Sequence, residues 1–589
     1  MIELHVSTNG NDDNEGSSEA PLRTISAAAE MAQPSDTITV SEGTYRERVN
    51  PPRGGTSDAC RITYQAAPGE EVWIKGSEIV QGWETMGGGI WKLTLSDSFF
   101  GEYHPFKDEI AGDWFRDKGR VQHTGEVFVD GKAMHEKASR EEVLNPELYP
   151  DAFGPEGQSL YVWCCEASEQ ATTIFGNFHD KDPNASLVEV SARPACFYPD
   201  APGRNFITVR GFSMAQAATQ WAAPTAEQIG LLGVHWSKGW IIEDNLIRDS
   251  RCVGISLGKD RGDGHNVWNN DRGVDAHGAD VYNRCVQSSL KRGWSGDTIG
   301  HHIVRNNIIS DCGAGGIIGG QGAIFSEISN NHIYNIHARR EFSGEEMGGI
   351  KLHAPIDVII HNNTIHHVGY YGIWLDWMTQ GTRVSRNLIF ATQTDVFIEV
   401  NHGPYLLDHN CLLSQTSLRV QSEGGAYVHN LIAGKIEVVI DDRATPYHPA
   451  HSTEILDTTE VGVGDDRHYN NIYLHENALS DYAAMPNPIF TGGNVELESG
   501  CCEIRKDDRG YVIEIKLARA ADVPTDRVTS DVLGATKLTG YPYVNPDDSP
   551  LQFDSDYFGK ARDSQQPTPG PFESVADSVV LECDMNLQI

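Results

Sequence analysis

The segment Gly372-Ile-Trp-Leu-Asp-Trp377 has a counterpart in Asp395-Val-Phe-Ile-Glu-Val400, and Glu399 follows Asp376 by 23 residues, at the equivalent position. In both segments small apolar residues alternate with aromatic and acidic ones, which is typical of β-strands, because successive side chains point to opposite faces. If one repeat forms one turn of a coiled sheet, the strands are neighbours and the two acids lie side by side on its outer surface. The residues expected to point inward are Ile373, Leu375, Val396 and Ile398.

The repeat that supports this coil is an asparagine followed two residues later by an apolar residue. It occurs at Asn245, Asn307, Asn331, Asn363, Asn387, Asn410 and Asn430, with a looser copy at Asn471. From Asn307 onward the steps are 24, 32, 24, 23 and 20 residues, as expected of a solenoid whose units must stack to bury their apolar sides. Short Ile/Val/Leu runs favour strands over helices, so we predict an all-β fold of coiled parallel sheets in which the asparagines form a structural column.

The chain divides into four predicted regions. They are residues 1–78, with a cap helix at 24–32 and the first coils; 79–200, an inserted β-sandwich; 201–480, the coiled sheet with the acids; and 481–589, a C-terminal coil or cap segment. The sandwich is expected because the asparagine repeat vanishes there and longer alternating strands appear. Those strands are Ile90–Leu95, Glu126–Gly131, Ser159–Trp163 and Ala171–Phe175.

Composition restricts the partners. A formal net charge of −37 with a pI near 4.9 repels nucleic acid, anionic membranes and polyuronates at long range, so we expect a neutral substrate. No run approaches the length of a membrane span, and residues 1–5 lack a signal-peptide pattern, so we predict a cytoplasmic protein. The eleven cysteines include no Cys-x-x-Cys, and we expect them to be reduced and mostly packed.

The expected distance between the two acids predicts the type of reaction. Adjacent parallel strands lie about 4.8 Å apart, so Asp376 and Glu399 are expected roughly 5 Å from each other, a spacing that suits a retaining glycosidase. Two carboxylates so close do not both ionise readily, so one should stay protonated near neutral pH. The alternative is a pair of solvated surface acids. Aromatic side chains with exposed faces beside the acids favour a sugar site, and the candidates are Trp374, Trp377, Phe397 and Tyr405.

Further candidates come from aligning Gly349-Ile-Lys-Leu-His-Ala354 with the first acid strand. This alignment puts Lys351 in the column of Trp374 and His353 beside Asp376, although Lys351 could equally be a charge on a solvated face. His402 is expected to shape the turn after the second acid strand or to touch substrate. The pairs His301-His302, His366-His367, Asp441-Asp442 and Asp465-Asp466 do not recur at metal-ligand spacing. We expect them to be structural surface residues, and we predict neither a metal ion nor a cofactor.

Three longer strings carry a family resemblance: Gly348–Ala354, Trp374–Trp377 with Gln380–Arg383, and Phe397–Tyr405. With the N-terminal layout and the insertion, they resemble the β-xylosidases of glycoside hydrolase family 120 over most of the chain, weakening after about residue 480. The resemblance implies a right-handed parallel β-helix with a flanking β-sandwich and a retaining, exo-acting mechanism. It also implies roles for single residues: Asp376 as nucleophile, Glu399 as acid/base, Glu346 and Lys351 as ligands of sugar hydroxyls, and Trp114 as a wall of the pocket.

We therefore predict a retaining β-xylosidase that hydrolyses neutral xylo-oligosaccharides from the non-reducing end to xylose. A pectinolytic hydrolase or lyase could share the coiled sheet, but it would need a basic or calcium-binding groove for its anionic polymer. A non-catalytic carbohydrate-binding protein would keep the aromatic residues without needing the acid pair. The sequence leaves the exact sugar and the oligomeric state open, and a homo-oligomer is possible.

Overall fold

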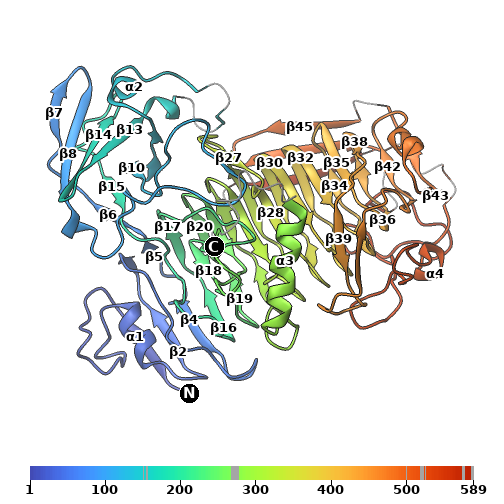
Figure 1. Ribbon diagram of the computed structural model, residues 1–589, viewed down its shortest axis with the longest axis horizontal. Coiled ribbons are helices and arrows are strands. Elements are labelled where there is room, and N and C mark those ends of the chain that lie inside the picture. The colour runs from blue at the N-terminus through green and yellow to red at the C-terminus, as the bar shows by residue number, and fades with distance from the viewer. Residues whose placement is uncertain are drawn as a thin grey trace. The chain divides into compact units, whose positions relative to one another are not determined.

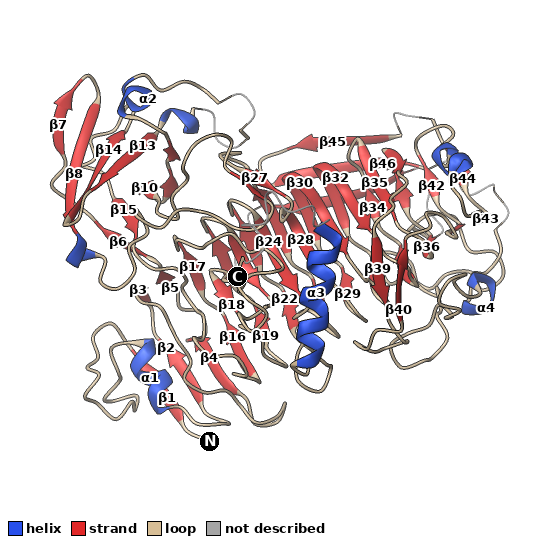
Figure 2. Ribbon diagram, in the orientation of Figure 1, coloured by secondary structure: helices blue, strands red, loops and turns tan. Residues whose placement is uncertain are grey.

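The computed structural model describes residues 1–149, 152–153, 157–266, 278–498, 501–517, 523, 525–573 and 578–585. The chain divides into two compact units. The first comprises Met1–Val274, Asn307–Gly322 and Tyr334–Gly348, and the second comprises Asp275–Asn306, Ala323–Ile333 and Gly349–Ile589. Strands dominate both units, and the helices are few and mostly short (Figures 1 and 2).

The first unit begins with coils of parallel sheet. One sheet contains, in order, β1 (Glu3–Val6), β2 (Thr37–Val40), β4 (Ile62–Ala66), β16 (Ile207–Arg210) and β19 (Ile241–Glu243). A second face contains β3 (Gly43–Tyr45), β5 (Val72–Lys75), β17 (Ser213–Ala215), β18 (Leu232–Gly233), β20 (Leu246–Arg248), β21 (Val253–Ser256), β23 (Ile308–Ser310) and β24 (Gly315–Gly320). The helix predicted at 24–32 is present as α1 (Ile25–Met31), which packs beside β1 and β2. Thr24 caps it, because its side-chain oxygen accepts a hydrogen bond from Ala27 N at 3.1 Å.

The insertion forms two antiparallel-rich sheets around one apolar core. The smaller sheet has the order β11 (Lys132–Ala133), β10 (Val127–Val129), β15 (Val188–Ser191) and β6 (Ser77–Ile79), and the larger has the order β12 (His135–Glu136), β13 (Val162–Ala167), β14 (Ala171–Asn177), β8 (Ile90–Ser96) and β7 (Glu84–Gly87). One buried apolar cluster joins side chains of these strands, such as Val127, Trp163 and Ile174, with Trp83 and Phe106 from connecting segments. The predicted sandwich is therefore confirmed, with α2 (Arg140–Leu144) packed against β13 and β14.

One predicted strand of the sandwich is partly wrong. Residues Gln158–Leu160 form a 3₁₀ turn, and the strand begins only at Val162. Gly157, with a φ of 75°, starts this turn in the left-handed region. The Ser159 hydroxyl accepts a hydrogen bond from the Tyr149 N–H at 3.0 Å.

The second unit continues the coiled architecture. One sheet contains β22 (Ile303–Arg305), β25 (Glu327–Ser329), β29 (Ile359–His361), β31 (Arg383–Ser385), β33 (Tyr405–Asp408), β36 (Gly425–Val428), β41 (Arg467–Tyr469) and β43 (Phe490–Gly492). The opposing face contains the start of β26 (His332–Ile336) and most of β28 (Gly348–His353), whose other residues belong to the first unit. It continues with β30 (Thr364–Asp376), β32 (Leu388–Glu399), β34 (Cys411–Leu412), β35 (Thr416–Gln421), β37 (Leu431–Ile432), β38 (Lys435–Val438), β42 (Ile472–Tyr473) and β44 (Val495–Glu496). Parallel pairing between successive coils is the organisation of a parallel β-helix.

A ladder of buried asparagines fixes one corner of each coil. In the second unit Asn331, Asn363, Asn387, Asn410, Asn430, Asn471 and Asn494 are linked by amide-to-amide bonds of 3.0 to 3.1 Å. In the first unit Asn245 donates to Asn307 at 3.0 Å. The residue before each ladder asparagine has a left-handed φ of 54 to 57°, except before Asn494, where glycine provides 63°. The predicted structural column is confirmed, and Asn494 extends it beyond the repeats recognised in the sequence.

Outside the coils, a small antiparallel sheet covers part of the second unit. It contains β45 (Cys502–Lys506), β46 (Gly510–Lys516) and β47 (Ser578–Asp584). Its apolar face packs with side chains of the coils in one cluster that includes Leu388, Phe390, Leu431, Ile513 and Leu581. The other additions are α3 (Gly278–Lys291), the hairpin β39 (Ala444–Tyr447)–β40 (Asp457–Glu460) and α4 (Ser530–Leu533) (Figure 1). These strands of the C-terminal segment therefore pack against the coils.

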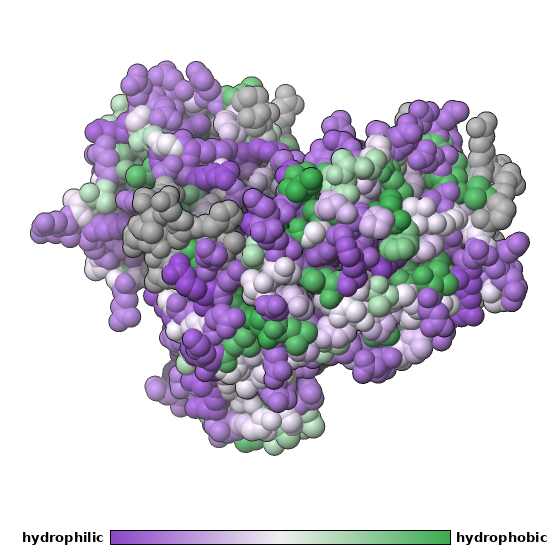
Figure 3. Space-filling model, turned by 45° about the vertical axis from the view of Figure 1, so that its right-hand side comes forward, coloured by the Kyte–Doolittle hydropathy of each residue, from purple (hydrophilic) through white to green (hydrophobic). Residues whose placement is uncertain are grey.

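The hydrophilic surface and the buried cysteines are as expected from the amino-acid composition. Hydrophilic groups predominate on the face drawn in Figure 3, with smaller hydrophobic areas between them. None of the eleven cysteines, all of which lie in described segments, forms a disulfide, and seven are buried, as expected of mostly packed side chains. Across the described ranges, no helix has the length and apolar character needed to cross a membrane.

Candidate active site

The two acids lie opposite each other at the ends of adjacent strands. β30 and β32 pair in parallel with Ile373 beside Val396, Trp374 beside Phe397 and Asp376 beside Glu399. This is the register that the sequence predicts. Paired residues on neighbouring strands lie about 4.8 Å apart, so the carboxyl groups share one small region. The alternate residues Ile373, Leu375, Val396 and Ile398 are fully buried in the coil interior.

Asp376 is held by two basic side chains through a single oxygen. Lys351 Nζ donates to Asp376 Oδ2 at 2.9 Å, and His353 Nε2 lies 3.1 Å from the same oxygen. Burial alone would raise the pKa of Asp376, but His353 and Lys351 outweigh it and hold that pKa below its ordinary value. Asp376 Oδ1 is buried and accepts no hydrogen bond from any residue that the structure describes. A charged carboxylate with one free oxygen is suited to nucleophilic attack.

Glu399 has the opposite protonation preference. Its Oε2 accepts from Trp374 Nε1 at 2.9 Å, and its Oε1 accepts from Arg443 Nη2 at 2.6 Å. Burial and the neighbouring charge of Asp376 raise the pKa of Glu399 to about 8, against the opposing effects of Arg443 and Lys351. A carboxyl group that is protonated at neutral pH can donate a proton to a leaving oxygen.

Arg443 does not reverse this preference because it is shared with a second acid. Its guanidinium also bonds to Asp441, at 2.9 Å through Nε and 2.7 Å through Nη2. Burial disfavours the charged guanidinium, but Asp441 and Glu399 outweigh this effect and raise the pKa of Arg443 above its ordinary value. The arginine therefore stays charged. Because Asp441 neutralises part of that charge, the effect of Arg443 on the pKa of Glu399 is weakened.

The expectation of exposed aromatic faces is wrong. Trp374, Trp377, Phe397 and Tyr405 are all buried, and the side chains of Asp376 and Glu399 retain only 5% and 12% exposure. The acids leave the coil on its outer side, but segments outside the repeat cover them. In α3, Asn283 Oδ1 accepts from Trp377 Nε1 at 3.0 Å, and the Tyr282 ring packs against His353. Tyr405 belongs to the other sheet and pairs with Tyr427 instead.

Lys351 and His353 lie where the alignment places them. Lys351 is buried rather than solvated, and its ammonium group lies 3.4 Å from the centre of the Trp374 ring. This short cation–π contact fixes the lysine between the tryptophan and Asp376. The solvated-face alternative for Lys351 is therefore wrong.

The remaining predicted binding residues are His402, Glu346 and Trp114. Both ring nitrogens of His402 are engaged by protein groups, Nδ1 with Glu423 at 2.8 Å and Nε2 with Thr445, which gives it a structural role at the turn. Glu346 and Trp114 belong to the first unit, where Glu346 is buried and Trp114 is partly exposed. Their contacts with a substrate, like that of His402, stay predictions.

Sequence reasoning missed Arg443, Asp441 as its partner, and Tyr282. Arg443 follows β38 in a segment that departs from the coil repeat, and Tyr282 lies on a helix between coils. Neither position has a periodic signal in the sequence. The paired histidines also differ from expectation, because His302 and His366 are buried rather than on the surface.

One carboxyl group kept charged and a second kept protonated, on adjacent rigid strands, match the requirements for cleaving a glycosidic bond. The fold and this pair together define the class as a glycoside hydrolase.

Comparisons with known proteins identify the family. Residues 80–190 match the family described as glycoside hydrolase 120, insertion domain, and residues 233–431 match a right handed beta helix region. Residues 8–50 match a family of unknown function, DUF1565. A solved structure described as the complex structure of XylC with xylose is 39% identical, covers 98% of this chain and 99% of that chain, and superposes with a TM-score of 0.93. The chain belongs to glycoside hydrolase family 120.

These findings confirm the family resemblance and the right-handed parallel β-helix with a flanking sandwich. A shorter similarity links the chain to the uncharacterized protein YwoF of Bacillus subtilis (strain 168), with 41% identity over 76 residues. That match spans 13% of this chain and only 16% of YwoF.

Proposed function

We propose that this protein is a retaining β-xylosidase that removes terminal xylose from the non-reducing end of neutral xylo-oligosaccharides. The observation that carries the proposal is the pairing of Asp376 with Glu399 on adjacent strands, with the pKa of one lowered and that of the other raised. The xylose bound by the similar protein XylC supports the choice of sugar. The charge of −37 supports a neutral rather than an anionic substrate.

In the proposed mechanism Asp376 Oδ1 attacks the anomeric carbon while Glu399 protonates the leaving oxygen. Lys351 and His353 hold the other oxygen of Asp376, so the attacking oxygen keeps its orientation and its charge. Glu399, now charged, then takes a proton from the water that releases the sugar. Two displacements at the same carbon retain its configuration. A spacing of roughly 5 Å between the carboxyl groups favours this route over inversion, which needs room for a water molecule between them.

The test is a panel of nitrophenyl glycosides together with xylobiose, with the anomer of the first product read by NMR. We expect the β-xyloside to be hydrolysed fastest and β-xylose to appear first. First appearance of α-xylose would refute retention, and hydrolysis of polygalacturonate alone would favour the pectinolytic alternative.

Two variants test the roles of the acids. Asp376→Ala should abolish turnover of every substrate. Glu399→Ala should slow xylobiose far more than an activated aryl xyloside, because a good leaving group needs little protonation. Equal losses on both substrates would contradict the acid role. Glu437→Ala, which removes a carboxylate from β38 two coils further along, is the matched control and should keep full activity.

A further inference from the structure

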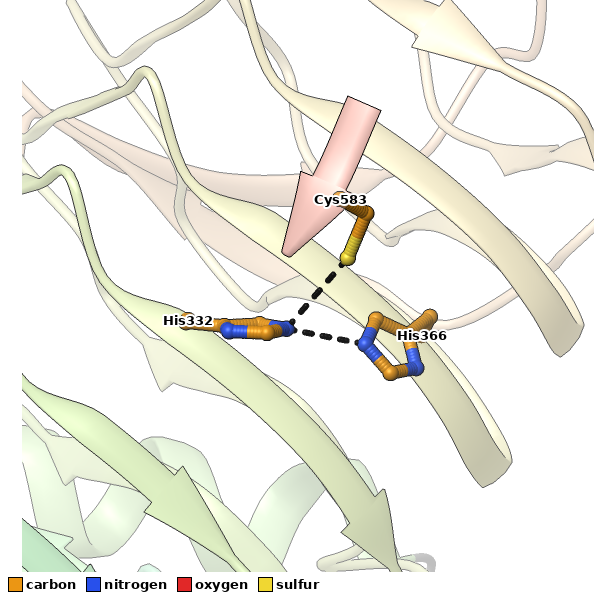
Figure 4. Close-up of side chains that lie close together, drawn as sticks. All are labelled: His332, His366 and Cys583. Atoms are coloured by element: carbon orange, nitrogen blue, oxygen red, sulfur yellow. Dashed lines mark hydrogen bonds between the residues drawn. The ribbon is translucent and has the colours of Figure 1, made fainter. Parts of the chain in front are cut away.

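Two histidines and a cysteine from three separate strands meet inside the second unit. His332 begins β26, His366 lies near the start of β30, and Cys583 comes from the C-terminal strand β47. Figure 4 shows the two imidazoles and the thiol pointing toward one another. His332 Nε2 lies 2.9 Å from His366 Nε2 and 3.5 Å from Cys583 Sγ, and all three ligand-type atoms lie within 4.8 Å of one another.

These distances are close to those of a metal site. With zinc–nitrogen bonds of about 2.0–2.1 Å and zinc–sulfur bonds of about 2.3 Å, tetrahedral geometry separates two nitrogens by roughly 3.3 Å and nitrogen from sulfur by roughly 3.6 Å. The separation of His332 Nε2 from Cys583 Sγ already matches. Cys583 Sγ lies within 4.8 Å of the His366 nitrogen, so these two atoms would need to approach by at most about 1.2 Å. The two imidazoles would need to part by only about 0.4 Å, within the reach of small side-chain rotations.

The surroundings favour the ligand form of both imidazoles. All three residues are buried, and His366 stacks on Phe390 with ring centres 4.9 Å apart. Burial in these surroundings disfavours the charged imidazolium form of both rings. Neutral imidazole is the state that binds metal ions.

His367 and Tyr511 orient the His366 ring. Its Nδ1 lies 2.8 Å from His367 Nδ1, and His367 Nε2 lies 3.2 Å from the Tyr511 hydroxyl oxygen. If His366 Nδ1–H donates to His367 and His367 Nε2–H donates to Tyr511, then His366 Nε2 carries a lone pair toward the centre of the cluster. Metal-binding histidines are typically oriented by such a bond from the other ring nitrogen.

We propose that His332, His366 and Cys583 bind one zinc ion, with a water molecule as fourth ligand, and that this ion fastens the C-terminal strand β47 to the coils. Two imidazoles and a thiolate are a donor set that zinc favours over magnesium or calcium. Binding would release the thiol proton of Cys583. This proposal revises the expectation from sequence that the histidine pairs are surface residues without a metal, and it is independent of the proposed glycosidase activity.

The experiment uses the full-length protein freed of metal with a chelator. Titration with Co²⁺ should produce a thiolate-to-cobalt charge-transfer band, and calorimetry with Zn²⁺ should give one tight site per chain. Zn²⁺ should also raise the Tm, because an ion that binds only the folded state stabilises it. Absence of tight zinc binding or of the charge-transfer band in the unmodified protein would overturn the proposal.

Matched variants locate the site. Cys583→Ala should lose the charge-transfer band and the zinc-dependent rise in Tm. Cys502→Ser, which changes a half-buried cysteine of the same small sheet, should retain both. If Cys583→Ala does not fold, His332→Gln is measured instead and should lose tight zinc binding. Retention of tight binding in the cluster variant, or its loss in Cys502→Ser, would place the ion elsewhere and refute the assignment.

Discussion

Replacing Arg443 by methionine should move the basic limb of the pH–rate profile to higher pH. Arg443 Nη2 lies 2.6 Å from Glu399 Oε1, where its positive charge favours the ionised form of the acid. Without that charge Glu399 should keep its proton to higher pH. Because Glu399 must be protonated for the first step of the proposed mechanism, activity should persist further into the alkaline range.

The size of the shift follows from the charges involved. Two unit charges 4 Å apart interact by about 4 kcal/mol at an effective dielectric constant near 20, which corresponds to roughly 3 pKa units. The side chains of Arg443 and Glu399 are 22% and 12% exposed, so water weakens this interaction. We therefore expect an upward shift of about 1–2 units from a starting pKa of about 8 for Glu399.

The assay is kcat/KM for a nitrophenyl β-xyloside across the pH range, because this ratio reports the ionisation of the free enzyme. Arg419→Met is the matched control. Arg419 lies over the Phe397 ring at 5.3 Å, and its only ion pair among the described residues is with Glu437. This control removes the same charge but should leave the limb nearly unchanged. A basic limb in Arg443→Met that stays in place, or moves to lower pH, would refute the electrostatic reasoning.

Three further variants test the site and the fold. Lys351→Met should raise the pKa of Asp376 and so move the acidic limb of kcat/KM to higher pH. It should also lower kcat by roughly 10²-fold. An acidic limb that stays in place would argue against an electrostatic role for Lys351. Trp374→Phe keeps an aromatic ring but loses the 2.9 Å hydrogen bond to Glu399. The basic limb of kcat/KM should therefore move to higher pH by less than in Arg443→Met, and a move to lower pH would count against Glu399 as the acid. Asn387→Ala removes a fully buried ladder amide and should lower the free energy of unfolding by about 2–4 kcal/mol in urea; a loss below about 0.5 kcal/mol, typical of a surface change, would show that the ladder is dispensable.

The coils could be predicted because each repeats the same physical requirement. A buried amide such as Asn387 donates to a backbone carbonyl and to the next asparagine while accepting from the coil before it, so no other residue type fits the position equally well. That column sets the register of the strands. The register in turn places Asp376 beside Glu399 and His353 beside Asp376.

The environment of the acids could not be predicted because segments outside the repeat supply it. Arg443 lies in the 41-residue step from Asn430 to Asn471, which also contains the β39–β40 hairpin. Tyr282 comes from a helix between coils. Hence sequence periodicity places the acids on the outer face but gives no information about what covers them. The cluster of His332, His366 and Cys583 was missed for the same reason, since its cysteine is more than 200 residues away in the chain.

The asparagine ladder has a consequence for how such a protein can diversify. Coil lengths vary from 20 to 41 residues between Asn331 and Asn471, yet the amide bonds continue without a break. Extra residues are therefore accommodated away from the ladder corner, and an insertion in one coil need not displace the strands of the next. A lineage could thus acquire new loops that reshape substrate selection while the two acids keep their spacing.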